Sequence, residues 1–252
     1  MNVAFFDCFS GIAGDMILGA LIDLGVDGEF LKKELKKINI SGYEIDIRKV
    51  KKNNISGTDV YVIVEEKQHH RNLSDIDDII NNSSLEGEVK ELSKKIFYRL
   101  AEAEGKIHDM EIDKVHFHEV GAIDSIMDIV GAVVCLKKLG VEKVFSSSLP
   151  LGKGFVKCSH GIIPIPAPAT VELLKNVPVY QSEANHEMVT PTGAAIITTI
   201  ADGFGKMPSM KIEKIGYGAG KIKSSQPGLL RVYLGKLEKN KIKYEKDFNF
   251  SN

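Results

Sequence analysis

Apolar and polar positions follow different periods in the first quarter of the chain. Residues 3–6 are a short apolar run before a turn of small residues, which predicts a buried strand that leads into a helix. The helix expected at residues 15–24 is apolar on most faces and stops at Gly25, so it should lie deep in the core. Residues 43–50 alternate, residues 58–64 are β-branched and aromatic, and a turn-rich connection joins them; together they predict a hairpin.

Helical and extended patterns continue to about residue 235. Further helices are expected at residues 29–37, 88–105, 126–139, 170–174 and 193–201. Another helix is expected to be capped by Ser74 and to run through Asp77 and beyond. Strands are expected at residues 141–145 and 229–234. From Leu149 onward, glycine and proline interrupt regular structure repeatedly, which excludes a plain helical bundle.

These elements predict an α+β fold. Residues 1–148 are expected to form a split β-α-β-like lobe that holds a metal site, and residues 149–235 a Gly- and Pro-rich mixed lobe. Residues 236–252 are lysine-rich and polar, so we expect a flexible tail. A doubly wound α/β sheet is the alternative, and the expected hairpin counts against it.

Composition restricts the partners and the compartment. The 33 basic and 34 acidic side chains give a net charge of −1, so a nucleic-acid partner is not expected, although a local basic patch could still bind a small anion. Three widely spaced cysteines without a Cys-x-x-Cys pair argue against a disulfide scaffold or a thiolate zinc site. The N-terminus lacks the basic region of a signal peptide and the apolar run at 16–22 is too short to span a bilayer, which predicts a cytoplasmic protein without membrane attachment.

The densest group of metal-binding side-chain types lies in residues 116–128. His116 and His118 point the same way if the segment is extended, and Asp124 and Asp128 share one face if the chain after Glu119 is helical. Imidazoles with carboxylates suit divalent nickel, zinc, cobalt or iron. Surface hydrogen bonding by the histidines and simple helix capping by Asp124 remain the alternative. His69 and His70 lie on a polar loop, where they could capture an ion weakly and release it, or merely be solvated.

Glycine-rich segments are the candidates for ligand binding. Ser10, Gly11 and Gly14 lie between a strand and a helix, where backbone N–H groups can hold a phosphate. No Lys or Arg occurs between Met1 and Gly28, so Asp7 and Asp15 could instead hold a metal, or Asp15 could be an ordinary first-turn residue. The later loops contribute two lysines that attract phosphate and two possible proton acceptors; these residues are Lys153, Lys157, His160 and Glu187.

Five ordered blocks resemble the nickel-insertion (LarC) family. They are residues 7–16, 116–125, 160–161 with 164–170, 190–195, and 216–220. The resemblance implies a nickel chelatase or cyclometallase of the lyase class. Such a protein inserts nickel into pyridinium-3,5-bisthiocarboxylic acid mononucleotide, forming one carbon–metal and two sulfur–metal bonds, and the product serves lactate racemase and related enzymes. It also implies dependence on CTP with manganese or magnesium.

Side-chain chemistry, considered together with this resemblance, leads to a hypothesis for the roles of the candidate residues. His116, His118 and Glu119, helped by Asp124 or Asp128, would bind nickel that His69 and His70 deliver. Lys153 and Lys157 would pair with the mononucleotide phosphate, and His160 or Glu187 would take the ring proton. The histidine tract is shorter than in many family members, and the family's CTP-binding second domain does not follow residue 235. We therefore expect a separate CTP-binding partner, and a homo-oligomer is possible.

Two other functions remain open at this point. A non-catalytic nickel chaperone would bind and transfer the metal without forming product. A metal-dependent hydrolase or cyclase would use the same ligands to activate water.

Overall fold

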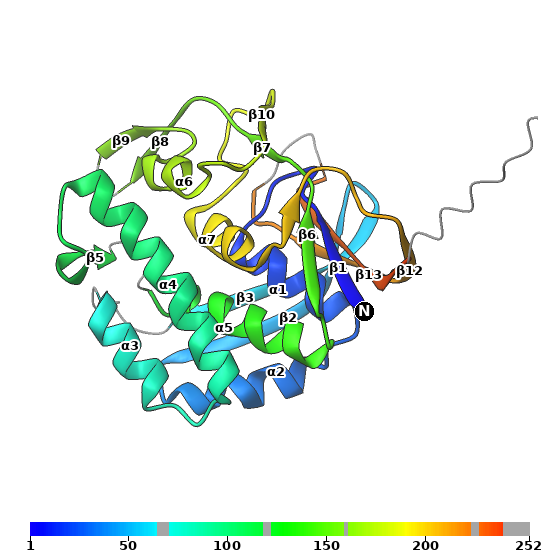
Figure 1. Ribbon diagram of the computed structural model, residues 1–252, viewed down its shortest axis with the longest axis horizontal. Coiled ribbons are helices and arrows are strands. Elements are labelled where there is room, and N and C mark those ends of the chain that lie inside the picture. The colour runs from blue at the N-terminus through cyan, green and yellow to red at the C-terminus, as the bar shows by residue number, and fades with distance from the viewer. Residues whose placement is uncertain (65–70, 118–121, 159–160, 223–226, 239–252) are drawn as a thin grey trace, which may run out of the picture.

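The structure is a computed structural model that describes residues 1–64, 71–117, 122–158, 161–222 and 227–238 (Figure 1). The helices are α1 (Gly14–Asp23), α2 (Gly28–Leu35), η1 (Lys36–Ile38), α3 (Leu73–Asn81), α4 (Gly87–His108), η2 (Ile112–Lys114), α5 (Ile123–Lys138), α6 (Pro168–Leu173) and α7 (Pro191–Ile200). The strands are β1 (Asn2–Asp7), β2 (Tyr43–Lys52), β3 (Ile55–Val64), β4 (Arg71–Asn72), β5 (His116–Phe117), β6 (Lys143–Ser146), β7 (Leu149–Leu151), β8 (Phe155–Cys158), β9 (Gly161–Pro164), β10 (Val179–Gln181), β11 (Gly203–Phe204), β12 (Met210–Ala219) and β13 (Leu229–Leu237). The predicted α+β class is confirmed.

A mixed seven-stranded sheet organises the described chain, in the order β11-β6-β1-β13-β12-β3-β2. β1 runs parallel to β6 and antiparallel to β13, whereas β2 and β3 form the predicted antiparallel hairpin. Helices stack outward from this sheet: α1 packs on β12 and β3, α5 packs on α1, and α4 packs on α5 (Figure 1). α5 is buried on most of its faces because it lies between two helical neighbours and is apolar nearly all round.

Glycines in β12 allow the backbone of α1 to touch the sheet. A Cβ atom added at Gly218 would lie 1.8 Å from Met16 O, and one added at Gly216 would lie 2.3 Å from Ala20 O. Both distances are far inside van der Waals contact, so any side chain there would push the helix away. The close approach brings Asp15, in the first turn of α1, near Lys221, which follows β12 and also contacts Asp59 of β3.

The sheet includes strands from both sides of the predicted lobe boundary at residues 148 and 149. β1 lies between β6 and β13, and β12 lies between β13 and β3. Pairing between strands so distant in sequence depends on tertiary packing, which local periodicity does not report. Lys236 and Leu237, assigned to the tail, belong to β13 because they pair with Asn2 and Met210. The remainder of the tail from residue 239 lies outside the described residues.

One local prediction was wrong, and one strand was missed. The N-cap of α3 is Asn72 rather than Ser74: the Asn72 side chain accepts a hydrogen bond from Asp75 N at 2.9 Å, and Asp75 Oδ2 accepts one from Asn72 N at 2.9 Å. This reciprocal capping box satisfies two N–H groups of the first turn, which Ser74, already inside the helix, does not do. The strand β12 was not predicted, because Gly216 and Gly218 interrupt its apolar pattern. None of the helices in the described ranges is long and apolar enough to cross a membrane.

Candidate functional site

Side chains from α1, α5 and the segment before α7 converge on one cavity of about 400 Å³, which we call the acidic cleft. The charged residues that line it are Asp15, Asp124, Asp128, Glu187 and Lys221. They come from four separate segments, the first and last of which, at Asp15 and Lys221, are more than 200 residues apart. The fold therefore concentrates carboxylates that the sequence separates.

Helix α5 supplies two of these carboxylates. It begins at Ile123, so Asp124 and Asp128 lie one turn apart on the same face, as predicted, and both line the cleft. Asp124 is exposed in the first turn, and its Oδ1 accepts a hydrogen bond from Ser125 N at 2.8 Å. Asp128 is half-buried one turn deeper.

Asp128 lies against the start of α1. A Cβ atom added at Gly14 would be 2.4 Å from Asp128 Oδ2 and 2.7 Å from its Cβ, so glycine is required for this contact. Burial raises the pKa of the Asp128 carboxyl well above its ordinary value, and the charges of Asp15 and Asp124 raise it further. Asp128 forms no hydrogen bond or ion pair with any residue that the structure describes. A cation in the cleft would stabilise its ionised form.

Asp15 lies in the first turn of α1 and faces Lys221. Its Oδ1 accepts a hydrogen bond from Met16 N at 2.8 Å, and its Oδ2 lies 3.3 Å from Lys221 Nζ. Burial raises the pKa of the Asp15 carboxyl, while the Lys221 ammonium acts in the opposite direction.

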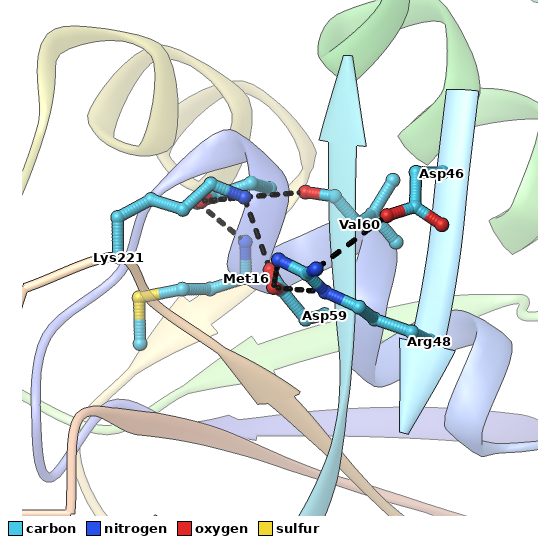
Figure 2. A network of polar contacts seen from close by, with 7 residues as sticks. Met16, Asp46, Arg48, Asp59, Val60 and Lys221 are labelled. Carbon is cyan, nitrogen blue, oxygen red and sulfur yellow. Dashed lines mark hydrogen bonds and ion pairs between the residues drawn. The ribbon is translucent and has the colours of Figure 1, made fainter. Parts of the chain in front are cut away.

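Lys221 belongs to a polar network that reaches across β3 and β2 (Figure 2). Its Nζ donates hydrogen bonds to Asp59 Oδ1 at 3.0 Å and to Val60 O at 2.7 Å. On the other side, Arg48 Nε and Nη2 both donate to Asp59 Oδ2 at 3.3 Å. Asp59 is thereby shared between two cations, and the ammonium of Lys221 is held at the edge of the acidic cleft.

A smaller apolar cavity of about 150 Å³ adjoins the acidic cleft and shares Asp15, Glu187 and Lys221 with it. Its other lining residues include Ser10, Met16, His186, Met188 and Ile222. Ser10 is buried, and its Oγ has no hydrogen-bond partner within the described part of the chain. This mostly apolar cavity suits an apolar group, and Ser10 Oγ is an unpaired polar atom at its wall.

The predicted ligand-binding residues fall into two groups. Ser10 borders the apolar cavity, Gly14 borders the acidic cleft, and Gly11 lies in the turn between them, where its N–H already donates to Cys8 O at 2.9 Å. Lys153 and Lys157 are exposed near and within β8 and line neither cavity, and Lys153 forms an ion pair with Glu183 at 2.6 Å.

The predicted histidine cluster falls largely on undescribed positions. His69, His70, His118, Glu119 and His160 lie outside the described residues, and of His116 only the backbone is described, in β5, where it pairs with Asn72. Within the described ranges, no three His, Cys, Asp or Glu side chains lie close enough together to hold a metal ion. Among the described side chains, Asp15, Asp124 and Asp128 line one cavity without forming such a group.

The sequence left the role of Asp15 open and did not point to two other participants, Asp59 and Lys221. The sequence allowed Asp15 to be either a metal ligand together with Asp7 or an ordinary first-turn residue. Asp15 is in the first turn of α1 and lines the cleft. Asp7 instead accepts a hydrogen bond from Arg231 Nε at 3.0 Å. Asp59 and Lys221 were not considered. The position of Lys221 immediately after the 216–220 block was the available signal.

Comparison with known proteins identifies the family of the chain. A family profile described as "Nickel insertion protein" matches residues 4–248. The chain belongs to this nickel insertion protein family. Its acidic cleft is built from three of the blocks by which the family resemblance was drawn, around Asp15, Asp124 and Thr190. No solved structure matches the chain.

Several curated relatives in the family are about half identical to the chain. A putative nickel insertion protein of Dictyoglomus thermophilum is 53% identical over 243 residues, covering 96% of this chain and 63% of the relative. A pyridinium-3,5-bisthiocarboxylic acid mononucleotide nickel insertion protein of Desulfitobacterium hafniense is 51% identical, covering 94% and 59%. The protein of that name from Acetivibrio thermocellus is 50% identical, covering 96% and 62%. The chain thus spans about 60% of the length of these relatives.

Proposed function

We propose that this chain takes part in inserting nickel into pyridinium-3,5-bisthiocarboxylic acid mononucleotide, and that the acidic cleft holds nickel before its transfer. The convergence of Asp15, Asp124 and Asp128 on one cavity, within segments shared with the nickel insertion family, carries this proposal. Two relatives that cover most of the chain bear the name of this activity. A cytoplasmic location is part of the same proposal.

The chemistry of the cleft agrees with temporary metal holding. Carboxylate oxygens bind divalent nickel but compete poorly with sulfur and nitrogen donors. Coordination positions that protein oxygens do not fill are available to the sulfur atoms of the substrate. Transfer from the cleft to the thio-nucleotide therefore runs from weaker to stronger ligands.

The wall shared by the two cavities is a suitable place for the base that accepts the proton released during insertion. A carbon–nickel bond replaces a carbon–hydrogen bond, so a base has to accept a proton beside the ring. Glu187 borders both the acidic cleft and the apolar cavity, which supports its assignment as the proton acceptor. Roles for His160, for the nickel ligands His116, His118 and Glu119, for delivery by His69 and His70, and for phosphate binding by Lys153 and Lys157 stay predictions.

Among the residues that line the described cleft, several are carboxylates and one, Lys221, is a cation. The cleft therefore offers little direct attraction to the phosphate oxygens of CTP. We therefore assign CTP binding to a separate C-terminal domain, a partner consistent with the greater length of the relatives. Homo-oligomer formation remains a prediction.

Nickel calorimetry on the full chain, with insertion measured after addition of the CTP-binding partner, tests the proposal. Asp128→Asn should weaken nickel binding at least tenfold and reduce insertion, because the half-buried carboxylate is lost. Asp113→Asn, an exposed acidic position in η2, is the matched control and should behave as the parent. A His116→Ala/His118→Ala variant tests the predicted imidazole ligands separately.

The outcomes separate the three functions. Unchanged nickel affinity in Asp128→Asn would refute the assignment of the cleft. Nickel binding without product in the presence of the partner would favour a chaperone, and phosphoester turnover without the thio-nucleotide would favour a hydrolase.

A further inference from the structure

The apolar cavity lies between two backbone segments that are fixed to each other. Ile12 N donates a hydrogen bond to Met188 O at 2.8 Å, and Thr190 N donates one to Ile12 O at 3.1 Å. A Cβ atom added at Gly11 would lie 1.9 Å from Met188 O, so the turn before α1 is pressed against the segment before α7. These contacts set the relative position of the two segments, and the cavity that they border is therefore a built feature of the fold.

Two buried methionine side chains line this cavity. Met16 and Met188 are each 5% exposed, and Ser182 Oγ donates a hydrogen bond to Met188 Sδ at 2.9 Å, which orients that thioether. Thioether sulfur is polarizable and makes favourable contacts with aromatic rings. A planar aromatic group is therefore a better match for this lining than an aliphatic chain.

Ser10 supplies an unsatisfied polar atom at the cavity wall. The residue is only 8% exposed, and its Oγ has no hydrogen-bond partner within the described ranges. A buried hydroxyl that has given up its bond to water without replacing it destabilises the fold. A ligand atom that accepts a hydrogen bond from Ser10 would remove this cost, so the hydroxyl marks a place for a polar substituent on the ring.

The charge around the cavity selects among aromatic rings. Across this cavity and the acidic cleft beside it, the charged lining residues are four carboxyl groups and one ammonium: Asp15, Asp124, Asp128 and Glu187, with Lys221. Even with Asp128 protonated, three carboxylates remain for one ammonium. The electrostatic potential is therefore negative, which favours a ring that carries positive charge and keeps a phosphate group of the same ligand in solvent.

We propose that the apolar cavity binds the pyridinium ring of a mononucleotide, and that Ser10 Oγ donates a hydrogen bond to an oxygen on a ring substituent. The ring is planar and cationic, and it packs against Met16 and Met188, while the phosphate extends into solvent. In pyridinium-3,5-bisthiocarboxylic acid mononucleotide the oxygen belongs to one thiocarboxyl group, which leaves the sulfur atoms to face the acidic cleft. Ser10 then orients the ring carbon that receives nickel.

This inference deepens the proposed function and rests on it for the identity of the thio-nucleotide. Recognition of the ring itself depends neither on nickel nor on insertion. Nicotinamide mononucleotide is a direct probe, because it carries the same pyridinium charge and a carboxamide oxygen but no sulfur. Its reduced, dihydropyridine form has nearly the same shape without the ring charge.

The test is a ligand-observed NMR titration of the full chain with each form of nicotinamide mononucleotide. The oxidised form should bind at least tenfold more tightly than the reduced form. Ser10→Ala should weaken binding of the oxidised form about fivefold, since one hydrogen bond is lost, whereas Ser84→Ala, at an exposed position, should not change it. Ile222→Lys alters a cavity-lining side chain that is 45% exposed and should weaken binding at least tenfold. Ile212→Lys, at a position that is 40% exposed and lines neither cavity, is its control.

Thermal unfolding of the same variants without ligand separates recognition from a structural role. Ser10→Ala removes a hydroxyl that has no partner, so its Tm should equal or exceed that of the parent. A lower Tm would show that the hydroxyl is bonded within the fold and would overturn the proposal. Equal affinity for the two forms of the probe, binding of neither form, or unchanged affinity in Ser10→Ala would overturn it as well. Any of these results would leave the nickel titrations of the acidic cleft unaffected, and a failure of nickel binding would leave the ring titration interpretable.

Discussion

Replacement of Gly14 by alanine is the sharpest structural test of the acidic cleft. Gly14 is the first residue of α1, and the added methyl would lie 2.4 Å from Asp128 Oδ2, 2.7 Å from its Cβ and 2.8 Å from its Cγ. A change of the Asp128 rotamer moves the carboxylate but not the Cβ atom, which is fixed to the backbone of α5. Relief therefore requires α1 and α5, which pack directly on each other, to separate.

The size of the effect follows from the required movement. Non-bonded carbon atoms pack at about 3.5–4.0 Å, so the Cβ contact at Gly14 has to open by roughly 1 Å. Overpacking of this kind in a dense core costs about 1–3 kcal/mol. We expect Gly14→Ala to lose about 2 kcal/mol of unfolding free energy, which corresponds to a fall in Tm of about 4–8 °C in a chain of this size. Nickel affinity should fall with it, because the Asp128 carboxylate is displaced from the cleft.

Gly87→Ala is a matched control, since Gly87 is the first residue of α4 and a Cβ atom there meets nothing within 4 Å. Alanine is the better helix former, so this variant should be neutral or slightly stabilised. The assay is urea denaturation of both variants, followed by nickel calorimetry. Equal stability of Gly14→Ala and Gly87→Ala, with nickel binding retained, would show that Asp128 is not held against α1 as described.

Further substitutions test other parts of the argument. Burial raises the pKa of Asp128, so the native state keeps a proton that the unfolded chain releases, and stability falls as pH rises above the ordinary value for Asp. Asp128→Asn has no carboxyl at this position, so its unfolding free energy should fall less as the pH rises and should exceed that of the parent at neutral pH. Urea titrations across pH 4–8 measure this, and an unchanged pH profile would contradict it. Asn72→Ala removes the capping box of α3 and should cost about 1 kcal/mol by denaturant unfolding, whereas Ser74→Ala should cost less. Gly218→Ala places a Cβ atom 1.8 Å from the backbone oxygen of Met16 and should leave little folded protein by circular dichroism; a native-like spectrum would refute the close packing of α1 on β12.

Local patterns predicted much of the element list. The apolar run of β1, the helix α1 that is apolar on most faces and the alternation of the β2–β3 hairpin all appear in the described chain. Each depends on the burial of its own short segment, which a local pattern reports. The shared face of Asp124 and Asp128 was predicted for the same reason, since helical spacing alone places them one turn apart.

Only the tertiary structure decided which charges meet. Lys221 lies more than 150 residues from Asp59 and more than 200 from Asp15, yet its ammonium contacts both. A hydrophobicity pattern does not indicate the packing role of the glycines of β12 or of Gly14 in α1. These glycines nevertheless permit the close approach of α1 to the sheet and to Asp128. Periodicity records the burial of each segment, whereas the electrostatics of a cleft depend on distances between segments, and the packing of the whole chain sets those distances.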